Sequence, residues 1–291
     1  MQEVSENIEK IKSIFLNTQL FYATNGSMKY LLEYLEKIPA TFRSIAYESA
    51  SMSIALKGFE NSMDTTEWQS FANGPAKAHQ AQLYIGLGWA IAKLNLPFLS
   101  VVEKLDRLLH FRVADGCGYY DGSFRQRQSV MRQQLPVYLP VAILSLYDEG
   151  LGRSLLYSCN ADIDKIKKTI ETFSAKRQAA LWRGMGIAVG YVGGCTDKLL
   201  KNIFDYAGEH GVQLACGAAL AAKSRMDANC MTTDTDRCSR LWFTLAGEAV
   251  KIFSVIPEDV ATNYDREDFY NCWIKQIEEG LTERFRAENN L

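Results

Sequence analysis

Seven polar side chains of this sequence are of types that carry acid–base chemistry or stabilise charge. Carboxyl and imidazole groups beside apolar residues have pKa values that an enzyme tunes toward neutrality, which makes them candidates for a catalytic role. An arginine in similar surroundings would stabilise negative charge. The candidate catalytic residues are Glu48, His79, Asp115, Asp121, Arg153, Asp234 and Asp236.

One segment, residues 115–124, departs from the helical pattern of the chain. It contains three glycines, two acids and three aromatic residues, and Asp-Gly occurs in it twice. Because Asp-Gly favours turns, the composition predicts an irregular loop. The loop is either a connector whose aromatic residues pack on the core, or a binding loop in which Asp115 or Asp121 acts as acid, base or charge stabiliser.

Arg153 is a charge set among small and apolar residues, and a buried charge needs a partner. Glu48 and Glu149 occupy equivalent positions in two repeated segments, so either acid is a candidate partner for Arg153 or Arg183 across a helix interface. Such a pair would be structural and tie the repeats together, which is the favoured interpretation, or it would line a cavity and act in chemistry.

His79 and two acids near the third repeat each have a structural and a chemical interpretation. His79 precedes a helix and shares a face with Gln82 and Tyr84, where it is a cap, a packing residue or a catalytic group. Asp234 and Asp236 fall at a helix start, where a hydroxyl or carboxylate caps free backbone N–H groups. The chemical alternative is an acid pair for isoprenoid cyclisation, although the D-x-D-D and D-D-x-x-D motifs are missing.

Aromatic side chains accompany these polar groups and would form the apolar wall of a binding site. Their rings supply a large apolar area, and their faces stabilise cationic intermediates. The candidate substrate-binding residues are Tyr84, Trp89, Tyr119, Tyr120, Phe124, Trp182 and Trp242.

These residues must be positioned by helices, because the chain lacks sustained strand-type alternation and its six prolines fall between periodic segments. The predicted helices cover residues 5–17, 27–37, 41–57, 77–95, 98–109, 138–158, 162–172, 175–192, 196–207, 209–228, 234–253 and 266–288. Within them a pattern occurs three times, in which a helix with closely spaced small residues is followed by a helix that opens with leucine and an aromatic residue.

Small residues at regular spacing let helix backbones approach closely, so the repeat indicates helical hairpins. The hairpins are predicted at about 41–95, 138–194 and 209–253. We therefore expect one all-α domain over residues 1–291, with repeated hairpins in a curved or closed, toroid-like array around a cavity.

Composition argues against several function classes. Lys plus Arg is 32 and Asp plus Glu is 34, and this net charge of −2 gives no long-range attraction for nucleic acid or an anionic membrane. The seven cysteines are scattered, which predicts reduced thiols in a cytoplasmic protein. Metal-ligand spacings and nucleotide-binding or nucleophile motifs are missing, so we expect no metal and no cofactor. We also expect no secretory signal and no membrane span.

Several segments together resemble a bacterial family of unknown function whose members are described as accessory proteins of enediyne polyketide biosynthesis. They are residues 46–50, His79 with 84–90, 115–122, 150–155, 182–186 and 217–225, and Asn229. The family pattern has Tyr-Glu-Gly where this chain has Tyr47-Glu48-Ser49, and an aromatic-His pair where it has Tyr119-Tyr120. The second departure argues against a histidine role in that segment. The resemblance implies participation in assembling a specialised metabolite and assigns no catalytic residue.

Three functional hypotheses follow. The leading one is a biosynthetic protein that binds an apolar polyene or isoprenoid-like intermediate in a helical cavity, with rearrangement or cyclisation as the reaction and residues 115–124 covering one mouth. The first alternative is a non-catalytic helical scaffold for partner biosynthetic enzymes, which predicts an interior filled by side chains. The second is a terpene-cyclase-like enzyme that uses Asp234 and Asp236.

Overall fold

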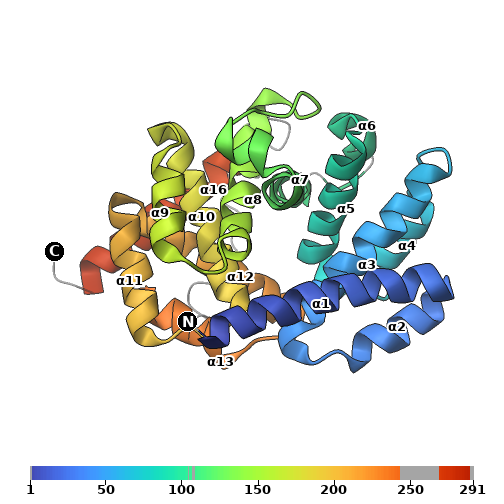
Figure 1. Cartoon of the computed structure of the whole chain (residues 1–291), viewed down its shortest axis with the longest axis horizontal. Helices are drawn as coiled ribbons and strands as arrows, with labels where there is room; N and C mark the ends of the chain where they lie inside the picture. The colour runs from blue at the N-terminus through green and yellow to red at the C-terminus, as the bar shows by residue number, and fades with distance from the viewer. Residues whose placement is uncertain (1, 104, 107–108, 243–268, 289–291) are drawn as a thin grey trace.

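Small residues on successive helices determine how this chain packs. The computed structural model describes residues 2–103, 105–106, 109–242 and 269–288, and over these ranges it contains helices and no strand (Figure 1). The prediction of an all-α fold is confirmed. The longer helices are α1 (Gln2–Asn25), α2 (Met28–Lys37), α3 (Ala40–Glu60), α4 (Thr66–Asn73), α5 (Gln80–Leu94), α6 (Phe98–Val102), α7 (His110–Phe124), α8 (Leu144–Ser158), α9 (Ile163–Glu171), α10 (Ala175–Val192), α11 (Asp197–Ala207), α12 (Gly211–Asp227), α13 (Thr233–Trp242) and α16 (Phe269–Glu288). The short helical turns are η1 (Lys77–His79), η3 (Arg127–Met131), η4 (Val141–Ile143) and η5 (Gly208–His210).

Six helices form a central row in which each packs along the next, in the order α3, α5, α7, α8, α10 and α12. At every step of this row a glycine lies against the neighbouring backbone. A Cβ on Gly86 would overlap the carbonyl oxygen of Glu48, and a Cβ on Gly118 would overlap that of Tyr147. The recurring small residues are therefore explained by the close approach of the helix backbones.

Two groups of three helices repeat the same packing register. Gly86 of α5 faces the backbone of Glu48 on α3, and Gly184 of α10 faces the backbone of Glu149 on α8. The contact between the second and third helices of each group also repeats. Gly88 of α5 faces the backbone of Val113 on α7, and Gly186 of α10 faces the backbone of Leu214 on α12. Hence α3, α5 and α7 correspond to α8, α10 and α12. The third predicted hairpin begins at α12, and its residues 243–253 lie outside the described residues.

The row curves, so that helices three places apart face each other across a polar interior. Arg153 of α8 reaches Glu48 of α3, and Gln82 of α5 donates a hydrogen bond to the Tyr191 hydroxyl of α10. A third hydrogen bond joins α7 to α12, from Arg112 to the Ser224 hydroxyl at 3.4 Å. At the ends of the row, Arg225 of α12 donates to a backbone carbonyl in the first turn of α3 at 3.1 Å. α1 packs along α3 and also contacts α10 (Figure 1).

The helices α7 and α8 lie parallel, so the chain must return between them. Gly118 and Gly122 of α7 face Tyr147 and Ser154 of α8, in the same order along both helices. Residues 125–143 make the return and contain η3 and η4. This connection contributes to the pocket described below.

The prediction that residues 115–124 form an irregular loop is wrong. These residues are helical and make up most of α7. Gly116, Gly118 and Gly122 each face the backbone or a small side chain of α5 or α8, so they serve helix packing and not turns. A glycine costs an isolated helix about 1 kcal/mol relative to alanine, and tertiary packing outweighs that cost here.

Other helix boundaries show where sequence patterns were informative. α10 begins and ends at the predicted residues, and Gly193 follows it with a φ of 67°, which is a favourable backbone conformation for glycine at a helix end. α4 is not predicted, because eight residues are too few for a clear helical period. The predicted helix over 98–109 includes α6, and of its later residues 104 and 107–108 lie outside the described residues.

Two further expectations concern the whole chain. All seven cysteines are free thiols, and five of them are buried. Within the described ranges, no helix has the length and apolar character needed to cross a membrane.

Candidate functional site

Three of the predicted site residues meet in one buried ion cluster. Arg153 donates from Nη2 to Oε2 of Glu48 at 2.9 Å and from Nη1 to Oδ2 of Asp115 at 3.1 Å. The guanidinium carbon of Arg153 also lies 4.5 Å from the centroid of the Tyr119 ring. The Glu48–Arg153 pair is one that the sequence predicted. Asp115 joins it because the segment that carries Asp115 is a helix.

Burial makes both carboxyl groups of this cluster weaker acids. Loss of hydration raises the pKa of Glu48 to about 7 and that of Asp115 to about 6, although the charge of Arg153 lowers both. The residues Glu48, Asp115 and Arg153 are each at most 5% exposed. Oδ1 of Asp115 and Nε of Arg153 have no hydrogen-bond partner among the described residues. The cluster therefore places charge inside the fold.

The equivalent position in the second group of helices holds another ion cluster. Arg183 donates from Nε to Glu149 at 2.6 Å and from Nη1 to Glu278 at 2.8 Å. The Tyr270 hydroxyl donates to the same Glu149 carboxylate at 3.1 Å. The sequence predicted the Glu149–Arg183 pair, but no pattern linked it to Glu278 and Tyr270 of α16. The Arg183 cluster joins α10 to its neighbour α8 and to α16, whereas the Arg153 cluster joins α8 to its neighbour α7 and, across the interior, to α3.

His79 is buried and packs against its neighbours. Its ring stacks on that of Tyr47 with centroids 3.8 Å apart, and its Nδ1 lies 3.4 Å from Oγ of Ser44. Burial lowers the pKa of the imidazole to about 4. A group that transfers protons at neutral pH works best with a pKa near 7, so this environment favours the packing interpretation.

Asp234 and Asp236 lie at the start of α13 and not in either ion cluster. Asp234 pairs with Arg237 at 3.3 Å and Asp236 with Arg240 at 2.7 Å, and about a third of each carboxylate side chain is exposed. The helix start is capped by the Thr232 hydroxyl, which accepts a hydrogen bond from the backbone N–H of the third residue on. The expected capping by a hydroxyl is thus present at this helix start.

Most aromatic residues predicted to bind substrate pack in the core. Trp89 meets Tyr119 edge to face with centroids 4.8 Å apart, and Trp242 donates from Nε1 to a backbone carbonyl of α11 at 3.1 Å. The buried members of this set are Tyr84, Trp89, Tyr119, Trp182 and Trp242, whereas Tyr120 is partly buried and Phe124 is exposed. Their burial explains the aromatic residues as core side chains.

Asp121, near the end of α7, lines a pocket of about 220 Å3, here called the Asp121 pocket. Its Oδ2 accepts hydrogen bonds from the hydroxyls of Tyr138 and Tyr147 at 3.2 and 3.0 Å, and its Oδ1 pairs with Arg125 at 3.0 Å. Burial raises the pKa of Asp121, while these three donors oppose the shift. The pocket is lined by Asn95, Asp121, Arg125, Gln128, Ser129, Gln134, Leu135, Pro136, Val137, Tyr138 and Tyr147.

Sequence reasoning identified Asp121 but missed its partners. Arg125 follows Asp121 by four residues, a spacing that puts both on one face of a helix. The prediction of a loop concealed this signal. Tyr138 and Tyr147 come from the connection between α7 and α8 and from the start of α8, and no spacing in the sequence relates them to Asp121.

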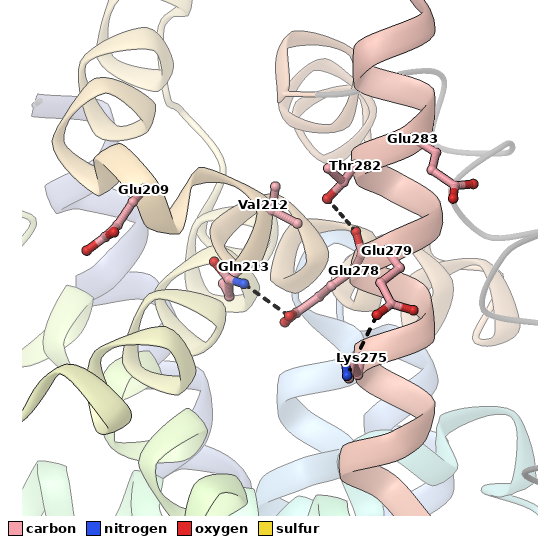
Figure 2. Close-up of a pocket in the computed structure, with 8 residues that line it drawn as sticks. All are labelled: Glu209, Val212, Gln213, Lys275, Glu278, Glu279, Thr282 and Glu283. Carbon is pink, nitrogen blue, oxygen red and sulfur yellow. Dashed lines mark hydrogen bonds and ion pairs between the residues drawn. The ribbon is translucent and has the colours of Figure 1, made fainter.

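A second pocket, of about 460 Å3, lies between η5, α12 and α16 (Figure 2). Figure 2 shows Glu278 extending from α16 toward Gln213, whose Nε2 donates to it at 3.0 Å. Glu278 also pairs with Arg183, and Lys275 lies 3.9 Å from Glu279. No group of three side chains suited to a metal ion occurs in the part of the chain that the structure describes. These contacts join α16 to α12 and α10.

Comparison with known proteins gives one match. The model of a family described as a protein of unknown function, DUF1702, matches residues 1–281. No curated protein and no solved structure is significantly similar to the chain. The match spans both groups of helices and the Asp121 pocket, and it assigns no role to any residue.

Proposed function

Since the chain belongs to the DUF1702 family, we propose that it binds an apolar intermediate of specialised-metabolite biosynthesis through a polar end of that molecule in the Asp121 pocket. The observation that carries the proposal is a buried carboxyl group, hydrogen-bonded by two tyrosines, in a pocket that also has an apolar side. The biosynthetic role itself comes from the resemblance to enediyne accessory proteins. A polyene or isoprenoid-like molecule is the proposed class of ligand.

The size of the pocket favours binding one end of the ligand and not the whole of it. Sites for drug-sized ligands measure about 300–1,000 Å3, and the Asp121 pocket measures about 220 Å3. The rest of the ligand would lie along Leu135, Pro136 and Val137, which line the pocket. Val137 is fully exposed, so an apolar chain placed there would cover it.

The polar groups of the pocket are suited to proton transfer at a carbonyl or hydroxyl group. Burial raises the pKa of Asp121 and so brings it closer to neutral pH. Burial also raises the pKa values of Tyr138 and Tyr147, which keeps both hydroxyls protonated as donors. Each tyrosine has one hydroxyl hydrogen, which it donates to Asp121 in the free protein. If the hydroxyls turned to a ligand oxygen, they would polarise it while Asp121 takes up or returns a proton. Isomerisation of an unsaturated intermediate is a reaction that this chemistry supports.

The test is product formation in a host that expresses the protein beside its gene neighbours. Asp121→Asn removes the carboxyl group and keeps its shape, so we expect the yield of product to fall about a hundredfold, as for the loss of a general acid–base. Tyr138→Phe removes one donor and should lower the yield about tenfold. Mass spectrometry of culture extracts measures both.

Tyr206→Phe is the matched control, because it removes a tyrosine–aspartate hydrogen bond of 2.9 Å on the surface. It should leave the product unchanged. A folded Asp121→Asn variant that makes wild-type amounts of product would contradict a chemical role for the pocket.

A non-catalytic scaffold for partner enzymes is the second candidate. It is favoured by the interior of the helical row, where the side chains of Glu48, Asp115 and Arg153 occupy the space between the helices. A scaffold predicts equal product from wild type and Asp121→Asn. The cyclase alternative gains no support from Asp234 and Asp236, because each carboxylate pairs with an arginine of its own helix.

A further inference from the structure

We propose that the connection between α7 and α8 docks the protein onto an anionic lipid surface. The arginine–apolar loop, residues 124–141, holds five of the twelve large hydrophobic side chains that are exposed in the described residues. They are Phe124, Met131, Leu135, Val137 and Val141. Exposed apolar side chains gathered in one segment mark an interaction surface.

The charge of this loop is entirely positive. It carries Arg125, Arg127 and Arg132, and no acid occurs in the sequence between Asp121 and Asp148. These two acids are buried, and each pairs with an arginine. Arg127 and Arg132 are exposed. The whole chain has a formal charge of −2, so the loop is a local positive region that complements an anionic surface.

The fold holds this loop in place with its apolar side chains outward. The backbone N–H of Phe98 donates to the carbonyl of Tyr138 at 3.1 Å, and the neighbouring Leu139 is buried. On either side of this anchor, Val137 and Val141 are exposed. A fixed apolar projection beside arginines can enter the boundary between lipid headgroups and acyl chains while the guanidinium groups meet the headgroups.

A lipid surface suits this loop better than a shaped protein partner. Val137 is 102% exposed and Val141 84% exposed, so both project fully from the fold and bury readily in a fluid phase. Leu135 and Val137 also line the Asp121 pocket, so docking would bring that pocket to the phase in which an apolar intermediate dissolves. The docking proposal rests on exposure and charge and is independent of any chemistry in the pocket.

Vesicle flotation of the full chain tests the proposal. We expect it to float with phosphatidylcholine vesicles that contain phosphatidylglycerol, to bind pure phosphatidylcholine weakly, and to be released by salt. The Arg127→Gln/Arg132→Gln variant should lower the partition coefficient about fivefold for each arginine removed. Val137→Asp/Val141→Asp should abolish flotation, because each substitution replaces an inserting side chain with a charge.

Two control variants remove exposed cations or change an exposed apolar side chain elsewhere in the fold. Lys198→Gln/Lys201→Gln removes two exposed cations from α11, and Leu16→Asp changes a leucine of α1 that is 63% exposed. Both should float like the wild type, and circular dichroism establishes that all variants are folded. The proposal is overturned if the wild type stays unbound on anionic vesicles, or if the arginine variant binds as tightly as the wild type. Self-association without vesicle binding would also overturn it, and would assign the loop to a second copy of the chain.

Discussion

The buried ion cluster and the Asp121 pocket both use a carboxyl group of α7, but they place it in different surroundings. Asp115 shares Arg153 with a second acid, and each of these three residues is at most 5% exposed. Asp121 accepts hydrogen bonds from Arg125 and from two tyrosines in a pocket that the fully exposed Val137 also lines. Positions less than two helical turns apart thus differ in access to ligand. The carboxyl pKa is raised at both positions, so a raised pKa does not by itself identify a binding site.

Removing the cation of the buried cluster should lower the free energy of unfolding more than any other change proposed below. Arg153→Met leaves Glu48 and Asp115 without their shared partner, and breaking a buried ion pair in this way costs about 3–5 kcal/mol. Urea denaturation followed by circular dichroism measures the loss. Arg240→Met removes a surface ion pair with Asp236 and should cost less than about 1 kcal/mol. Equal losses in the two variants would show that the cluster is not the stronger determinant of stability.

The pH dependence of stability tests whether the cluster holds a proton. Burial raises the pKa of Glu48 from 4.5 to about 7, so the folded chain keeps a proton that the unfolded chain releases. The free energy of unfolding should therefore fall as pH rises from about 4.5 to about 7. Glu48→Gln should reduce this fall by on the order of 2 kcal/mol.

Urea denaturation at a series of pH values measures the slope of the free energy of unfolding against pH. Asp236→Asn removes a partly exposed acid and serves as the control, with a slope expected to match that of the wild type. If Glu48→Gln also keeps the wild-type slope, Glu48 is not the group that holds the proton.

A substitution in the Asp121 pocket should change the free energy of unfolding least. Asp121→Asn retains an oxygen that accepts hydrogen bonds from the tyrosines, and the partner Arg125 is partly exposed. We therefore expect the free energy of unfolding to fall by about 1 kcal/mol. Asp115→Asn, on the same helix, weakens a fully buried charge cluster and should cost about 2–3 kcal/mol. Thermal and urea unfolding of the two variants give the comparison. A larger loss for Asp121→Asn would mean that its carboxylate is chiefly a structural group.

The sequence predicted the fold class well, but it located the site only in part. The small residues around Glu48 and Glu149 indicated helix packing, and these two acids do occupy equivalent places. Local preference predicts turns at the glycines of residues 115–124, because it does not reveal a neighbouring backbone. That error separated Asp115 from Arg153 and hid the helical spacing of Asp121 and its arginine.

The amino-acid pattern alone determined that this chain is helical and that its helices pack closely, since apolar periodicity and small residues act locally along each helix. Tertiary structure alone decided that Arg153 lies between Glu48 and Asp115, and that Asp121 lies in a pocket with tyrosines from distant segments. The physical reason is that hydration, and with it the pKa of an acid, depends on every element packed around a side chain. Sequence spacing specifies only the elements on which each side chain lies.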